Sequence, residues 1–151
     1  ITAEKGRKIT IISESMNEAD VTRFLSLPFA MVGSDGLPGD GLPHPRLYGT
    51  FPRVIRRFVN KLGVLTLPEA IHKMTGMPAQ RLGLNDRGRL AVGCRADIVI
   101  LDPGNVVDQA TFDEPRQYPS GISTVIVDGE VVIHGGEHTG RTPGGFIKYQ
   151  S

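Results

Sequence analysis

Apolar and polar residues in the first part of the chain alternate between the spacing of strands and the spacing of helices. Residues 8–13 are rich in β-branched side chains, which favours a strand. Asn17 can cap a following helix whose apolar residues recur three and four positions apart, and Pro28 ends that helix. Residues 29–34 form the next short apolar run. Strand, helix and strand in this order predict one βαβ unit with a right-handed parallel crossover.

The clearest helical pattern lies in residues 51–62. One face carries apolar side chains three or four positions apart, and the other face is basic. The basic residues are Arg53, Arg56, Arg57 and Lys61. We interpret them as the solvated face of an amphipathic helix rather than as a patch that binds nucleic acid.

A second helix is expected to begin at residues 66–69, where Thr-Leu-Pro-Glu has the pattern of a capping box. This helix is predicted to run to about Thr75, with Gly76 as its C-terminal cap. A short turn over residues 78–82 follows and ends at Gly83. Helices therefore dominate the chain between the βαβ unit and residue 84.

The pattern becomes extended from residue 89 onward. Residues 89–92 and 96–101 are predicted strands. Residues 123–127 and 130–133 are predicted to form a hairpin, because the Asp-Gly pair between them favours a type I′ turn. The later part of the chain is therefore expected to be a small antiparallel β module.

Length and composition limit what this α/β chain can be. It has 151 residues, 39% of them hydrophobic and 22% charged, which suffices to bury one core. A complete (β/α)₈ barrel needs about 250 residues, and the first residue is Ile1 rather than Met. We therefore expect a piece of a larger protein or a processed product. It would comprise the terminal βα units of a (β/α)₈ barrel, further helices and the antiparallel β module.

Charge, hydropathy and cysteine content exclude several classes of protein. The formal net charge of +1 argues against a nucleic-acid-binding protein. No apolar run approaches the roughly 18 residues that a membrane span needs. The single cysteine, Cys94, excludes an internal disulfide framework and fits a reducing compartment. A soluble, cytoplasmic protein without a nucleic-acid or membrane partner is predicted.

The strongest candidate for chemistry is Asp35, which directly follows the apolar run 29–34. Catalytic groups of α/β barrels lie at the C-terminal ends of the strands. Taken alone, however, Ser-Asp-Gly is more typical of a turn or a helix cap. The role of Asp35 therefore depends on the motifs that accompany it.

Several motifs of the chain occur in the order of one known family. Residues 33–36 are Gly-Ser-Asp-Gly, and residues 44–52 are His-Pro-Arg-Leu-Tyr-Gly-Thr-Phe-Pro. The later motifs lie at residues 75–79, 82–84, 88–90, 96–99, 128–129 and 140–144. Together they resemble the N-acyl-D-amino-acid deacylase (D-aminoacylase) branch of the metal-dependent amidohydrolase superfamily, over nearly the whole chain.

The resemblance implies a function for the parent protein. Members of the family hydrolyse N-acyl-D-amino acids to a carboxylate and a D-amino acid at a zinc site in the mouth of a (β/α)₈ barrel. Residues 1–84 would be the C-terminal part of this amidohydrolase barrel. Residues 85–151 would be a segment of a small, β-rich composite domain of the urease-like kind.

The same resemblance assigns roles to individual residues. Asp35 is the acid–base residue, which takes a proton from metal-bound water and delivers it to the departing amine. Arg46 binds the α-carboxylate of the substrate, which a guanidinium can hold through two hydrogen bonds. His44 and Tyr48 are interpreted as residues that shape the pocket or pack the loop, and His44 is not interpreted as a metal ligand.

The zinc ligands of the family, histidines and a cysteine, have no counterparts in this chain. Asp35 can contact a metal ion but cannot hold it alone, since a catalytic zinc needs about three protein ligands. The remaining histidines and the cysteine are interpreted as structural; these are His72, His134, His138 and Cys94. We therefore expect a zinc-dependent parent protein and an isolated chain that binds no catalytic metal and is inactive.

Two alternatives stay open. The chain can be a non-catalytic module that folds and oligomerises, because exposed barrel edges favour self-association. It can also belong to an amidohydrolase that acts on cyclic amides, of the dihydroorotase or hydantoinase kind. The preferred D-side chain cannot be predicted, since much of the side-chain pocket is expected outside this chain.

Overall fold

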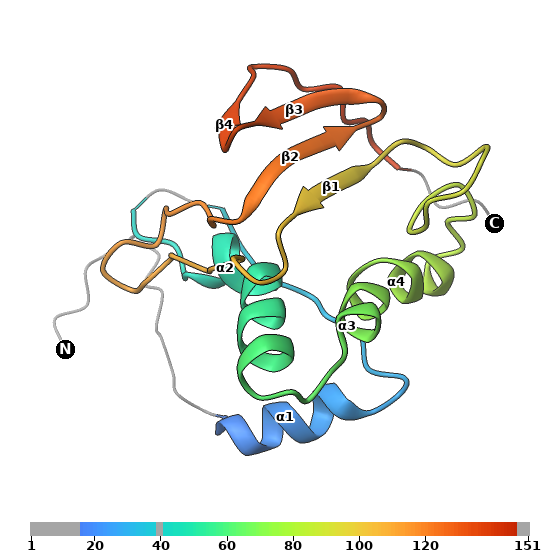
Figure 1. Cartoon of the computed structure of the whole chain (residues 1–151). Helices are drawn as coiled ribbons and strands as arrows, with labels where there is room; N and C mark the ends of the chain where they lie inside the picture. Colours follow the sequence, from blue (N-terminus) through green and yellow to red (C-terminus); the bar gives the residue numbers. More distant parts are fainter. Residues whose placement is uncertain (1–15, 39–40, 148–151) are drawn as a thin grey trace, which may run out of the picture.

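The computed structural model describes residues 16–38 and 41–147, in which a group of helices precedes an antiparallel sheet. In Figure 1 the sheet lies at the top and α1 at the bottom, with α2, α3 and α4 between them. The helices are α1 (Glu18–Ser26), α2 (Arg46–Arg53), η1 (Val54–Lys61), α3 (Leu67–Met74) and α4 (Gly76–Arg81). The strands are β1 (Ile98–Leu101), β2 (Ile122–Val127), β3 (Glu130–His134) and β4 (Glu137–His138).

Helix α1 confirms the first predicted helix. The side chain of Asn17 accepts a hydrogen bond of 2.9 Å from the backbone N–H of Asp20, which satisfies one of the free donors at the helix start. Glu18 and Asp20 in the first turn complement the helix dipole. The helix ends before Leu27, whose backbone is extended. The strand predicted for residues 8–13 lies outside the described residues.

Helix α2 and η1 follow each other without a break, which confirms the helix predicted for residues 51–62 and extends it back to Arg46. Pro52 lies inside α2 and has no N–H to donate to the preceding turn. From Val54 the helix widens to π-helical turns, in which each N–H bonds five residues back. At the end of η1, the Leu62 N–H accordingly donates to the Arg57 carbonyl at 2.9 Å.

The core lies where η1 meets α3. Val54, Leu65 and Ala70 are buried together. Partly buried apolar residues surround them, namely Leu25, Val32, Val59, Val64 and Met74. The apolar face that the sequence predicts for residues 51–62 therefore packs against α3, and Leu25 joins α1 to the same core.

Helix α3 has the predicted capping box. The N–H of Thr66 donates to Glu69 Oε2 at 2.7 Å, and the N–H of Glu69 donates to Thr66 Oγ1 at 3.4 Å. The prediction that Gly76 caps this helix was wrong, because Gly76 begins α4 and does not take the left-handed backbone of a glycine cap. A Cβ atom on Gly76 would lie 2.7 Å from His72 Nδ1, so a larger residue there would require the His72 ring to move. Gly83, with φ of 70°, follows α4 as predicted.

Two predicted strands are absent from the structure. Residues 29–34 are irregular. The Val32 N–H donates a backbone hydrogen bond of 3.1 Å to the carbonyl of Lys73 on α3. Residues 89–92 are also irregular, and the side chains of Leu90 and Val92 are exposed. A strand needs a neighbouring strand to bond its backbone groups, and no described residue pairs with either segment in a sheet.

The sheet confirms the predicted β module. Its strand order is β1-β2-β3-β4 with antiparallel neighbours throughout. Asp128 and Gly129 have φ of 48° and 83°, as a type I′ turn between β2 and β3 requires. The short strand β4 was not predicted. It follows a second tight turn at Gly135 and Gly136, which both have positive φ.

Candidate active site

Asp35 lies on the irregular segment that approaches the start of α2. Its φ of 47° is in the left-handed region, which is uncommon for residues other than glycine. The hydroxyl of Ser34 accepts a hydrogen bond of 3.2 Å from the Gly36 N–H, which closes a local turn around Asp35. A Cβ atom on Gly36 would lie 2.9 Å from the Leu47 Cα atom. This position therefore needs glycine, and the close approach brings Asp35 to α2.

Arg46, the first residue of α2, forms an ion pair with Asp35. Arg46 Nη2 lies 2.9 Å from Asp35 Oδ2. The Asp35 side chain is 78% exposed and that of Arg46 39% exposed, so the pair is accessible from solvent. Exposed ion pairs contribute only about 0–1 kcal/mol. Another carboxylate can therefore replace that of Asp35 on Arg46 at little cost.

The Arg46 guanidinium has further bonding capacity. Its Nε atom is buried and has no hydrogen-bond partner among residues 16–38 and 41–147. The Nη2 group is directed to Asp35. A guanidinium presents five N–H donors in a fixed plane. Arg46 can therefore bind an anion through donors that Asp35 does not occupy.

His44 supports the backbone of Arg46. Its Nδ1 atom accepts a hydrogen bond of 3.0 Å from the Arg46 N–H, so the neutral ring carries its proton on Nε2. The ring edge packs against Phe112, with ring centroids 5.1 Å apart. Burial and the nearby Arg46 charge lower the pKa of His44, and the Asp35 carboxylate opposes this shift. A neutral His44 keeps the start of α2 in place.

Tyr48 packs against Tyr118 from the segment before β2. The two rings meet edge to face, with centroids 5.5 Å apart. The structure therefore gathers three of the four predicted site residues in one contact chain, from Asp35 through Arg46 to His44. It places Tyr48 two residues further along α2, against a different partner.

The basic face of the helix is largely exposed, as predicted, and its arginines also form ion pairs with distant acidic residues. Arg53 and Arg56 form ion pairs of 3.3 and 3.2 Å with Asp108, whose side chain is only 9% exposed. Arg57 donates from Nε to Glu18 Oε1 at 2.6 Å, and this hydrogen bond lowers the pKa of Glu18. Sequence pattern alone missed these contacts, because their acidic partners lie 39 to 55 positions away.

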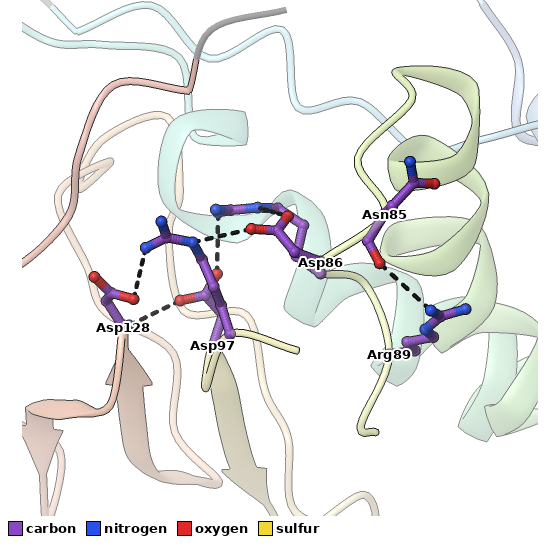
Figure 2. Close-up of polar contacts among 7 residues, drawn as sticks. Asn85, Asp86, Arg89, Asp97 and Asp128 are labelled. Atoms are coloured by element: carbon purple, nitrogen blue, oxygen red, sulfur yellow. Dashed lines mark hydrogen bonds and ion pairs between the residues drawn. The ribbon is translucent and has the colours of Figure 1, made fainter. Parts of the chain in front are cut away.

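A second ionic cluster ties the segment after α4 to the hairpin turn of the sheet. Figure 2 shows Asp86, Asp97 and Asp128 facing the guanidinium groups between them. Arg87 bonds Asp86 and Asp97 at 3.3 and 3.2 Å. Arg95 bonds Asp86 and Asp128 at 3.0 and 2.8 Å. The cluster borders a cavity of about 770 Å³. Its charges are paired with one another, which indicates a structural link.

The described part of the chain lacks two features. Within residues 16–38 and 41–147, no three histidine, cysteine, aspartate or glutamate side chains gather as a metal site would require. The residues described therefore do not fit a catalytic zinc ion by themselves. In the same ranges, no helix is long and apolar enough to cross a membrane.

Comparison with known proteins defines the class. Residues 13–133 match the model of the amidohydrolase family, and the chain belongs to that family. An N-acyl-D-glutamate deacylase of Alcaligenes xylosoxydans xylosoxydans is 50% identical over 119 residues, 79% of this chain and 24% of the relative. The chain spans 24–32% of the length of three curated deacylases that it matches.

Two solved structures are similar to the chain. A crystal structure of D-aminoacylase has a TM-score of 0.81 and 46% identity, over 83% of this chain and 27% of that one. An N-acyl-D-glutamate deacylase of Bordetella bronchiseptica, solved with zinc and a phosphonate inhibitor, has a TM-score of 0.75 and 47% identity. That match covers 78% of this chain and 25% of the deacylase. The resemblance to the deacylase branch is thus confirmed in sequence and in structure.

Proposed function

We propose that this chain is the C-terminal portion of a zinc-dependent enzyme that hydrolyses N-acyl-D-amino acids. The observation that carries the proposal is the 2.9 Å contact between Asp35 and Arg46. In an N-acyl-amino acid, the scissile amide nitrogen and the free carboxylate are attached to the same carbon atom. An acid that protonates the nitrogen and an arginine that binds the carboxylate must therefore be neighbours.

In the proposed reaction each residue has a separate task. Arg46 holds the α-carboxylate through charge-assisted hydrogen bonds. Asp35, displaced from Arg46 by that carboxylate, takes a proton from a water molecule as the water oxygen bonds to the amide carbon. It then gives this proton to the amide nitrogen as the C–N bond breaks, because an amine leaves readily only when it is protonated. His44 keeps the first turn of α2 in position through the Arg46 N–H.

The zinc ion is proposed from the relatives and not from this chain. The deacylase from Bordetella bronchiseptica was solved with zinc, whereas the described residues here form no group of three ligands. The expectation that the isolated chain binds no catalytic zinc and is inactive remains a prediction, as does the cytoplasmic location.

The arrangement of the whole protein is part of the proposal. We assign residues 1–84 to the C-terminal part of a (β/α)₈ barrel and residues 85–151 to a segment of a composite β domain. The helices α1 to α4 and the sheet β1 to β4 follow this division along the chain. The TM-score of 0.81 with a D-aminoacylase supports the same architecture.

The intact protein, loaded with zinc, tests this function. We expect hydrolysis of N-acetyl-D-methionine or N-acetyl-D-glutamate, slow hydrolysis of the L-enantiomers, and no turnover of hydantoins or dihydroorotate. Asp35→Asn should lower kcat by about 10²–10⁴, the usual contribution of a positioned acid. Asp113→Asn, at an exposed position outside the site, is the matched control.

Two other results would each identify a different function. Turnover of cyclic amides alone would assign the protein to the dihydroorotase or hydantoinase kind. A folded, zinc-loaded protein that hydrolyses neither class would indicate a non-catalytic module.

A further inference from the structure

Lys73 is a buried charged residue that the proposed reaction does not use. It lies on α3, and only 5% of its surface is exposed. A buried ammonium group is costly unless hydrogen bonds replace its water. Here Nζ donates to the carbonyl oxygens of Leu27 and Ala30, at 2.5 and 3.1 Å. Both acceptors belong to the segment that leads to Asp35.

The backbone of Lys73 holds the same segment at a third point. Its carbonyl oxygen accepts a hydrogen bond of 3.1 Å from the Val32 N–H. The Val32 side chain packs against the buried core between η1 and α3. One residue of α3 therefore bonds three backbone groups within residues 27–32, and Asp35 follows three positions after the last of them.

These bonds hold the segment from the side of α3. Among the described residues, 29–34 are irregular and pair with no strand. The segment is attached upstream by Lys73 and downstream by the close approach of Gly36 to Leu47. Asp35 lies between these two attachment points, with its carboxylate exposed beside Arg46.

We infer that Lys73 is a positioning residue for Asp35. It fixes the position of this acid relative to the amide bond that the proposed deacylase cleaves. This inference rests on the proposed function. The ammonium group itself does not reach the substrate. It acts by donating hydrogen bonds to the Leu27 and Ala30 carbonyls, which keep the segment against α3.

The inference predicts a specific kinetic effect in the intact, zinc-loaded protein. Lys73→Met keeps most of the length of the side chain but removes its donors. We expect kcat for an N-acetyl-D-amino acid to fall by about 10–10²-fold, because small displacements of a catalytic group are costly. KM should change less than about twofold, since Arg46 is held separately by α2 and His44. Lys73→Arg, which keeps donors, should recover part of kcat.

Lys61→Met is the matched control. It makes the same chemical change at an exposed position at the end of η1, and kcat and KM should stay at wild-type values. Zinc content and melting temperature are measured for every variant. A folded, zinc-loaded Lys73→Met protein with wild-type kcat, or with KM raised and kcat unchanged, would overturn the inference.

If Lys73→Met does not fold, Lys73→Leu replaces it, because leucine also lacks a donor. A folded Lys73→Leu protein with reduced kcat and unchanged KM supports the inference, and one with wild-type kcat overturns it. If neither variant folds, the residue serves the fold as a whole and the inference is wrong.

Amide hydrogen exchange provides a readout that does not need activity. The N–H of Ala30 bonds to Leu27 and that of Val32 bonds to Lys73. Both should exchange faster in Lys73→Met, while the Ala70 N–H inside α3 keeps its protection. If the wild type hydrolyses no N-acyl-D-amino acid, the proposed function fails and exchange still tests the attachment. Unchanged exchange at both amides would overturn the attachment itself.

Discussion

Gly36 and Leu47 approach so closely that a Cβ atom on Gly36 would lie 2.9 Å from the Leu47 Cα atom and 3.0 Å from its Cδ1 atom. Backbone cannot give way as a flexible side chain can. Gly36→Ala should therefore push the Asp35 segment away from α2, break the 2.9 Å contact with Arg46 and lower kcat/KM by about tenfold or more.

Gly33→Ala is the matched control for this effect. Nothing lies within 4 Å of a Cβ atom built on Gly33. Steady-state kinetics of the two variants in the intact protein measure the difference. Equal activity in both would show that the close approach does not place Asp35.

Replacement of Arg46 separates substrate binding from chemistry. Arg46→Met removes the charged partner of the substrate carboxylate, which is typically worth about 1.5–3 kcal/mol, so KM should rise about 10–100-fold. Arg46→Lys should recover only part of this loss, since an ammonium group cannot bind a carboxylate bidentately. A substrate amide without the carboxylate should be hydrolysed equally by wild type and Arg46→Met. If Arg46→Met lowers kcat alone, the assigned role is wrong.

His44 makes stability depend on pH. Its pKa is lowered in the folded protein, mainly by burial and by Arg46. The unfolded chain therefore binds the proton first, at about pH 6.5. Stability is intact above this pH and is lost as the pH falls through the lower pKa of the folded state. His44→Asn keeps an acceptor for the Arg46 N–H and does not titrate. Its melting temperature should therefore change less between pH 7 and pH 5 than that of the wild type.

His134→Asn is the comparison for this experiment. His134 is exposed on β3, and its replacement should leave the pH dependence of the wild type in place. A His44→Asn protein that still loses stability below pH 6.5 as the wild type does would contradict the prediction.

Self-association is expected when the 151 residues are produced alone. Phe24, Phe29 and Leu37, before α2, expose 62%, 72% and 74% of their surfaces. Large exposed apolar side chains can favour association. Gel filtration with light scattering should give a mass above 16.3 kDa, and Phe29→Ser should reduce it. A strict monomer at high concentration would argue against association.

Features with local chemistry were predicted well from the sequence. The capping box of Thr66 and Glu69 and the turn of Asp128 and Gly129 depend on residues that are neighbours in the chain. The amphipathic pattern of residues 51–62 was also sufficient to predict a helix, because its apolar face packs against the core whatever the partner residues are. The motif order identified the family before any geometry was known.

Features that depend on distant partners were not predicted. Residues 29–34 and 89–92 have the composition of strands, but a strand forms only beside another strand. The pairing of Arg53 and Arg56 with Asp108 joins segments more than 50 positions apart. The burial of Lys73 also gave no signal, since lysine is normally an exposed helix residue.

The contacts of Arg95 have a consequence for the behaviour of the molecule in salt. Arg95 reaches Asp86, after α4, and Asp128, at the tip of the β2–β3 hairpin, and all three side chains are about half exposed. Mobile ions screen such pairs, whereas they leave the apolar core between η1 and α3 unaffected. Rising ionic strength therefore loosens the hairpin from the helices before it weakens either part.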